Sequence, residues 1–435
     1  MSDEQLHSPV LPSVNPAEAY AADMARLQRT TPIGPSDDAW LVLAHALTRF
    51  SELSAAELSQ TIPHAADMLA VSAVAMGLAS ESTVLRAARA LRSLHDPRIQ
   101  LATGYDSITE VVVSTQAVAE DQEVAGALGL AYATLTALLS AFGPRIRPRM
   151  QGNVFAQLGR AARQLGANDI ARDMYEEAMV VGYESESLDV VARAVLGLGV
   201  MALTRGNYPK ARELFERGLM NADRAKDPEL IRSAHHGLLN CGLASGDLDS
   251  AMVHGWNVLR LCIAPDSRAE ALMNMAEICR LTGEHDAAMK VYAVAMEWTS
   301  QRRVRLHAAS GALLSAATSG RSAEAARYRA LLHELLPAEP DPYTRAVIGL
   351  EFADSLRRLG EAAAAGAQLS AARALAAEHE FHELLHRAEA AEHNTDVAPT
   401  KVEATRRATR RTRAYRSEHF RMVLHSLNGL TAASL

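Results

Sequence analysis

Cysteine, aromatic residues and long apolar runs are scarce in this sequence. The three cysteines, Cys241, Cys262 and Cys279, are too few and too widely spaced for a disulfide framework or a four-cysteine zinc site. Aromatic residues make up 5% of the 435 residues, and glycine (25) and proline (16) are modest in number, while alanine is abundant. This balance favours closely packed helices over large sheets. We expect buried thiols in a reducing compartment.

Charge and hydropathy argue against two further classes. A net charge of −7 does not suit a uniformly basic nucleic-acid-binding protein. The most apolar stretch, residues 68–78, is well short of the roughly 20 residues that span a bilayer. The first residues carry acids and prolines where a secretory signal has a basic segment followed by an apolar run. We therefore expect a cytoplasmic protein.

The strongest positive signal is internal repetition. Two segments that begin at Phe155 and Val195 carry the same residue types at the same spacing, with a small residue at Gly159 and at Gly199. Each continues into a glycine turn, an alanine and, four residues later, an aromatic residue. The alanines that follow the successive turns are Ala171, Ala211, Ala251, Ala288, Ala325 and Ala365, at separations of 40, 40, 37, 37 and 40 residues. Such a period indicates stacked helix pairs, in which small residues let the backbones approach.

This pattern resembles the tetratricopeptide repeat (TPR) over about residues 150–390, although its 37–40 residue period exceeds the usual 34. The resemblance implies an all-α fold, a right-handed superhelical solenoid of antiparallel helix pairs. It also implies that the first helices line a concave groove that grips a peptide or a helix. The later repeats are degenerate, with His235 at the position of the first large apolar residue.

The rest of the chain continues the helical pattern. Upstream, we predict helices over 16–29, 37–50, 65–78, 82–94, 107–118 and 123–142, between turn signals rich in proline and glycine. Residues 1–149 are either diverged repeats of the same solenoid or a separate helical domain, and the matching helix lengths favour repeats. The predicted domains are thus 1–149, a TPR-like solenoid over 150–393, and a linker with a basic C-terminal helix over 394–435.

Counting from Gly159 and its equivalents predicts which polar residues face the groove. Asparagine amides there can bond the backbone of a guest, and arginines can meet its carboxylates. The predicted groove residues are Asn153, Gln157, Arg160, Arg193, His236, Asn240, Asn274, Glu277 and Arg280. Each of them can also be ordinary solvated surface.

The string His382-Glu383-Leu384-Leu385-His386 matches the HExxH motif of zinc hydrolases. On a helix, this spacing places two imidazoles on one face to hold zinc, with Glu383 as general base. The string falls near the start of another predicted packing helix, however, and a third ligand is not evident. We therefore predict no metal site and keep a zinc hydrolase as an alternative.

Residues 197–202 (GLGVMA) superficially match a dinucleotide fingerprint, but that motif needs a preceding strand. Here the glycines fall inside a predicted helix, where they are explained as helix contact points. We predict no cofactor.

The C-terminal tail, residues 400–435, is basic. It carries Lys401, Arg406, Arg407, Arg410, Arg411, Arg413, Arg416 and Arg421 against Glu403 and Glu418. Arg406, Arg410 and Arg413 share one helical face and could contact phosphates or nucleic acid. The helical spacing of Phe420, Val423, Leu424 and Leu427 instead suits a helix that covers the apolar end of the array.

These features together predict a non-enzymatic scaffold or regulatory adaptor that binds a protein or peptide partner. The first alternative is a regulator that contacts nucleic acid through the arginine-rich tail.

Overall fold

The computed structural model describes residues 43, 66, 83–94, 108–339, 341–379, 381–393 and 417–429. Within these residues the chain is helical and contains no strand. The helices of the first half are α4 (Thr83–Leu94), α6 (Thr109–Val124), α7 (Leu128–Phe142), α8 (Pro148–Gln164), α9 (Asn168–Glu184), α10 (Leu188–Thr204) and α11 (Tyr208–Ala225). Those of the second half are α12 (Pro228–Ser245), α13 (Leu248–Leu261), α14 (Pro265–Leu281), α15 (His285–Trp298), α16 (Arg302–Ser319), α17 (Ser322–Leu335), α18 (Pro342–Arg358), α19 (Ala362–Glu378), α20 (His382–His393) and α22 (Glu418–Gly429). Two short 3-10 helices, η2 (Gly143–Arg145) and η3 (Leu336–Ala338), follow α7 and α17.

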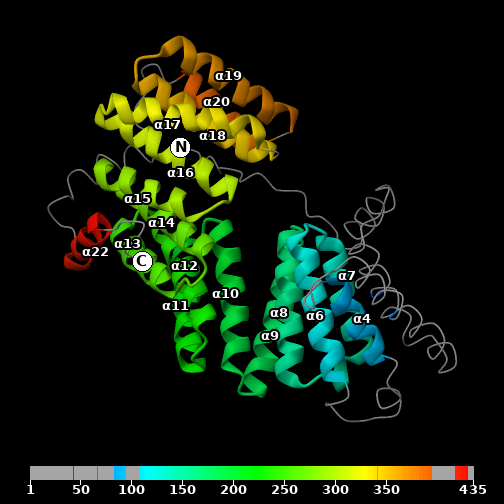
Figure 1. The fold of residues 1–435 in the computed structure, drawn as a ribbon. Helices are drawn as coiled ribbons and strands as arrows, with labels where there is room; N and C mark the ends of the chain where they lie inside the picture. Colours follow the sequence, from blue (N-terminus) through cyan, green and yellow to red (C-terminus); the bar gives the residue numbers. More distant parts are fainter. Residues whose placement is uncertain are drawn as a thin grey trace, which may run out of the picture. The chain divides into compact units, whose positions relative to one another are not determined.

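The chain forms two compact units that divide between Leu230 and Ile231 (Figure 1). In the first unit, α8 packs against α9 and α10 against α11, and the first helices α8 and α10 also contact each other. In the second unit, the pairs are α14 with α15, α16 with α17 and α18 with α19, and the first helices α14, α16 and α18 contact one another in succession. Each unit is therefore a stack of antiparallel helix pairs.

Glycines in the left-handed conformation join the two helices of each pair. In the described residues they are Gly126, Gly166, Gly206, Gly246, Gly283, Gly320 and Gly360, with φ between 71° and 82°. Only glycine adopts this conformation without strain, and it ends the first helix while the chain reverses. The residue five positions after each glycine is a buried alanine, which includes all six alanines that the sequence marks. The predicted turns are thus confirmed.

The first of these glycines reveals a helix pair that the sequence analysis divided wrongly. Predicted helices over 107–118 and 123–142 are α6, which continues to Val124, and α7, which begins at Leu128. Gly126 makes the turn between them, and Ala131 occupies the position of the marker alanines with no exposed surface. The turn was not predicted, because the residues around Gly126 are apolar and their pattern is typical of a continuous helix. The predicted helix over 82–94 is confirmed as α4, whereas those over 16–29, 37–50 and 65–78 lie outside the described residues except at Leu43 and Ala66.

Glycines inside the helices make room for aromatic rings of the neighbouring helix. A Cβ on Gly159 would lie 2.8 Å from the ring of Tyr175, and one on Gly197 would lie 2.3 Å from the same ring. Gly199 meets Phe215 in the same way, at 2.8 Å. Residues 197–202 thus lie inside α10 and serve helix packing, as the sequence predicts.

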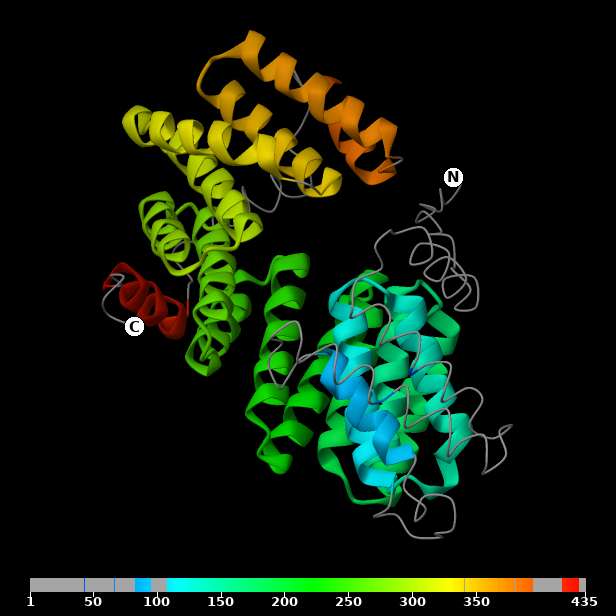
Figure 2. The same cartoon turned by 45° about the vertical axis from the view of Figure 1, so that its right-hand side comes forward.

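The tail contains a helix, α22, but it does not cover the end of the array as predicted. It packs against α13 and α15, two second helices in the middle of the second unit (Figures 1 and 2). There it buries Phe420, Val423 and Leu427. The sequence thus predicts the amphipathic helix and its intramolecular contact, while the contact lies on α13 and α15 and not at the end of the array. Spacing within a helix predicts its apolar face, but it carries no information about which distant surface receives that face.

The described residues form an all-α solenoid of stacked helix pairs. The right-handed superhelical sense and the domain boundaries at residues 149/150 and 393/394 stay predictions. Along the stretches that the structure covers, no helix is both long enough and apolar enough to cross a membrane.

Candidate binding face on the first helices

One face of each first helix carries the polar residues that the sequence analysis singled out. Residues three, six and nine positions before a turn glycine share this face, because three residues make almost one helical turn. We call it the first-helix face. Its members include Gln157, Arg160 and Arg163 of α8, Asn274, Glu277 and Arg280 of α14, and Glu351, Asp354 and Arg357 of α18.

In the first unit this face holds an ion pair between α6 and α8. Nε of Arg160 lies 2.7 Å from Oε2 of Glu123, and a second carboxylate, that of Glu120, lies 3.8 Å from the guanidinium. The Glu123 side chain is 7% exposed and that of Arg160 is 40% exposed. Desolvation acts to lower the pKa of Arg160, but the Glu123 charge outweighs it, and the pKa is raised. The Arg160 guanidinium therefore stays charged at any physiological pH.

The other predicted groove residues of this unit differ in burial and in hydrogen bonding. Gln157 is buried, and its amide donates to the backbone oxygen of Gln116 at 3.1 Å and to Glu123 at 3.4 Å. The Asn153 side-chain oxygen is buried and accepts no hydrogen bond from any residue that the structure describes. Arg193 is exposed. Gln157 thus supports the fold, while Asn153 and Arg193 keep unused bonding capacity.

In the second unit, Glu277 is the acceptor at the centre of a polar network. It is bonded by two groups: Arg280 donates through Nε at 2.7 Å and also through a terminal nitrogen, and the Tyr292 hydroxyl donates at 2.9 Å. Burial and then the charge of Glu277 raise the pKa of Tyr292 well above its ordinary value. Desolvation opposes the charge of Arg280, but Glu277 outweighs it and raises the pKa. This network holds both charged side chains in fixed positions on the face.

Glu351 of α18 extends the network toward α16. Its Oε2 accepts a hydrogen bond of 2.7 Å from the buried Ser310 hydroxyl. Burial raises the pKa of Glu351; the Ser310 bond opposes this, and the nearby Glu277 charge adds to it. A hydrogen bond thereby joins α18 to α16, and the charges of Glu277 and Arg280 of α14 act on Glu351.

Three predicted residues lie on α12 and α14 of this unit. Desolvation and the charge of Arg232 lower the pKa of His236. The side chains of Asn240 and Asn274 are partly exposed, and neither amide bonds to another residue in the described part of the chain. Their neighbours Leu239 and Met275 both lie beside Gly255 of α13, at 3.6 and 3.1 Å from a Cβ built there. Residues next to the two amides, on α12 and α14, therefore both pack against α13 near Gly255.

The HExxH string starts α20, as predicted. His382, Glu383 and His386 are all exposed there, and no group of three potential metal ligands occurs among the described residues. The predicted phosphate-contacting residues, Arg406, Arg407, Arg410, Arg411 and Arg413, lie outside the described residues.

The sequence analysis missed Glu123, Tyr292, Ser310 and Glu351. A signal for Glu351 was present, because it stands nine residues before Gly360, as Asn274 stands before Gly283. Glu123 carries the same kind of signal, because it stands three residues before Gly126, as Arg280 stands before Gly283; it was not found because the turn at Gly126 was not predicted. Ser310 is at none of these positions, and α16 brings it to the face.

Comparison with known proteins adds little beyond the fold. No protein-family model and no curated protein matches the sequence. The crystal structure of BtubC (BKLC) from P. vanneervenii aligns with a TM-score of 0.41 and 14% identity over 57% of this chain and 91% of that chain. The crystal structure of a Rap protein complexed with Competence and Sporulation Factor aligns with a TM-score of 0.46 and 11% identity over 85% of this chain and 99% of that chain. The stacked pairs define an all-α, TPR-like helical-repeat protein.

Proposed function

We propose that this protein is a non-enzymatic interaction module that binds a segment of another polypeptide on its first-helix face, as a scaffold or regulatory adaptor. The observation that carries the proposal is the pair of free amides, Asn240 on α12 and Asn274 on α14, the second of which lies almost one helical turn before Glu277 of the fixed Arg280–Glu277–Tyr292 network. An asparagine amide offers a donor and an acceptor to the backbone of an extended or helical guest.

The network supports this function because it is already ordered. A guest that meets Arg280 and Glu277 does not have to immobilise them, since each is bonded in the free protein. Preorganised polar groups lower the entropic cost of binding. The exposed and partly exposed positions of the face thus offer many shallow contacts around a rigid centre.

A displayed library of random peptides, selected on the full-length chain, tests the proposal. Peptides that bind the wild-type chain should lose about thirtyfold in affinity for an Asn240→Ala/Asn274→Ala variant, since two hydrogen bonds contribute about 1 kcal/mol each. Asn168→Ala, at an exposed position where α9 begins, is the matched control and should bind normally. If the selected peptides bind the double variant as tightly as the wild type, the binding face lies elsewhere.

A nucleic-acid function of the tail is not the main proposal, because no observation in the described residues favours it. It stays an alternative.

A further inference from the structure

The tail helix α22 occupies a defined surface on the second helices of the second unit. It lies along α13 and α15, on helices that do not form the first-helix face. Phe420, Val423 and Leu427 are each at most 3% exposed and belong to the same apolar cluster as Met252 and Trp256 of α13. Their spacing is i, i+3 and i+7, the apolar stripe of an amphipathic helix.

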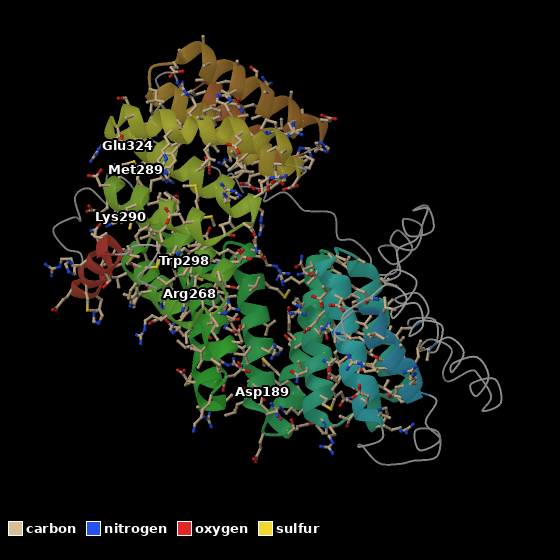
Figure 3. All side chains as sticks on the ribbon, in the orientation of Figure 1. Asp189, Arg268, Met289, Lys290, Trp298 and Glu324 are labelled. Carbon is tan, nitrogen blue, oxygen red and sulfur yellow. The ribbon has the colours of Figure 1, made fainter. Side chains whose placement is uncertain are left out.

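Both ends of α22 are bound by polar groups of the helices beneath. At its start, the backbone N–H of Ser417 donates to Oδ2 of Asp249 at 2.9 Å, and the Ser417 hydroxyl accepts from the N–H of Phe420 at 3.1 Å. At its other end, Lys290, which is labelled in Figure 3, donates to the carbonyl oxygen of Asn428. An acid at the N-terminus and a base at the C-terminus complement the helix dipole. The surface therefore recognises the direction of the helix as well as its apolar face.

The surface differs from the corresponding surfaces of α9 and α11. Six, seven and ten residues after the turn glycine, α13 has Met252, Val253 and Trp256. The same three positions hold Arg172, Asp173 and Glu176 in α9, and Arg212, Glu213 and Glu216 in α11. Those helices present charge to water there, as the second helices of a solenoid usually do. The apolar residues of α13 therefore suit a surface that receives another helix.

The connection of α22 to the rest of the fold is indirect. The stack of pairs ends with α20, whereas α22 binds to α13 and α15, several helices earlier in the chain. Residues 394–416 lie between α20 and Ser417 in the sequence. A helix of the same chain that occupies a binding surface competes with other ligands at a high local concentration.

We propose that the outer surface of α13 and α15 is a second binding site, specific for a short amphipathic helix, and that α22 is its resident occupant. The partner it fits is a helix of another protein with bulky apolar residues at i, i+3 and i+7 and an N-capping serine or similar residue, which displaces α22. Asp249 and Lys290 select the orientation of the incoming helix, and Met252 and Trp256 belong to the apolar cluster that covers its apolar stripe. This site is separate from the first-helix face, and the proposal does not depend on a guest there.

The test uses the full-length chain and a fluorescent peptide of residues 417–429. In a Phe420→Ala/Leu427→Ala chain the tethered helix no longer competes, so the peptide should bind at least about tenfold more tightly than it binds the wild-type chain. A peptide with the same two alanines should not bind. Adding Lys290→Ala to the chain should weaken binding severalfold, whereas Lys210→Ala, a surface lysine of α11, should not.

Two results would overturn the proposal. One is a double-variant chain that keeps the wild-type circular dichroism but binds the peptide no better than the wild type. The other is a wild-type dimer that the two alanines convert to a monomer, because it would assign the surface to exchange of α22 between copies.

Hydrogen exchange of the wild-type chain gives an independent measurement if the double variant does not fold. Amides of residues 418–429 should exchange at least about tenfold faster than those of α14, because α22 opens by itself. Equal protection of α22 and α14 would make α22 an integral part of the core and contradict the proposal.

Discussion

The ring of Tyr292 fills the space that Gly311 leaves open on the neighbouring first helix. A Cβ on Gly311 would lie 2.4 Å from the Tyr292 hydroxyl oxygen, closer than such atoms approach in folded proteins. The same hydroxyl donates to Glu277, so the packing of α15 on α16 also positions the polar network of the first-helix face. Packing between repeats and the geometry of the candidate site are thus coupled through one side chain.

Replacing Gly311 by alanine should destabilise the protein by about 1–3 kcal/mol, because the added methyl displaces a buried ring. Gly366→Ala in α19 is the matched control, since a Cβ there meets nothing within 4 Å. That change should stabilise the helix by about 0.5–1 kcal/mol. Urea unfolding followed by circular dichroism measures both, and a neutral Gly311→Ala would contradict the tight contact with Tyr292.

Removing the Tyr292 hydroxyl should cost about 1–2 kcal/mol of stability, because the buried phenol donates to a charged acceptor. Tyr328→Phe is the control, since the Tyr328 side chain is also buried but donates no hydrogen bond to the described residues. We expect that control to unfold within about 0.5 kcal/mol of the wild type. Equal changes in the unfolding free energy of the two variants would show that the hydrogen bond from Tyr292 to Glu277 does not contribute to stability.

Glu351 and Asp354 of α18 should give opposite pH dependences. Burial raises the pKa of Glu351 in the folded state above its value in the unfolded chain. The ionisation of Glu351 therefore destabilises the folded state progressively as the pH rises from the unfolded-state pKa to the folded-state pKa. Glu351→Gln should therefore be more stable than the wild type near neutral pH, and the gain should vanish below about pH 4.

The pKa of Asp354 is lowered, because Arg358 and Arg357 outweigh its desolvation. Its stabilising contribution is present above the unfolded pKa and is lost as the pH falls through the folded pKa. Asp354→Asn should thus be less stable near neutral pH, with a difference that closes in acid. Unfolding free energies of both variants across the acid range check this, and a shift of the same sign in both would refute it.

Arg160 should matter more to stability than its exposure suggests. Arg160→Ala leaves the buried Glu123 carboxylate without its cation, which should cost about 1–3 kcal/mol. Arg172 is equally exposed, at 43%, but its partner Asp169 is 85% exposed. Arg172→Ala should change the unfolding free energy by less than about 1 kcal/mol. Melting temperatures that fall equally in both variants would show that the burial of Glu123 has no effect.

The helix pairs could be predicted from the sequence because their signals are local. A turn glycine and an alanine five residues later recur along the chain, and each acts on the few residues around it. The prediction missed the turn at Gly126, where the flanking residues are apolar and the glycine gives the only signal of a break. Helix type and turn position thus follow from short-range sterics where the turn residues are polar.

The candidate site could be predicted only in part. Gln157, Arg160, Asn274, Glu277 and Arg280 lie on the predicted helices and share the predicted face. Their pairing could not be predicted, because the partners Glu123 and Tyr292 come from other helices. Whether the predicted groove residues bind a guest is a separate question that the displayed-library experiment tests.

The sequence alone determined the helix pairs from residue 150 onward, their turns and the amphipathic character of the tail, because backbone conformation and apolar periodicity depend on neighbours within a few residues. Only the tertiary structure decided that Glu351 accepts from Ser310 and that Asp249 binds the start of α22, 168 positions along the chain. Such contacts depend on how whole helices stack. The packing of many side chains determines that stacking, and no short stretch of sequence encodes it.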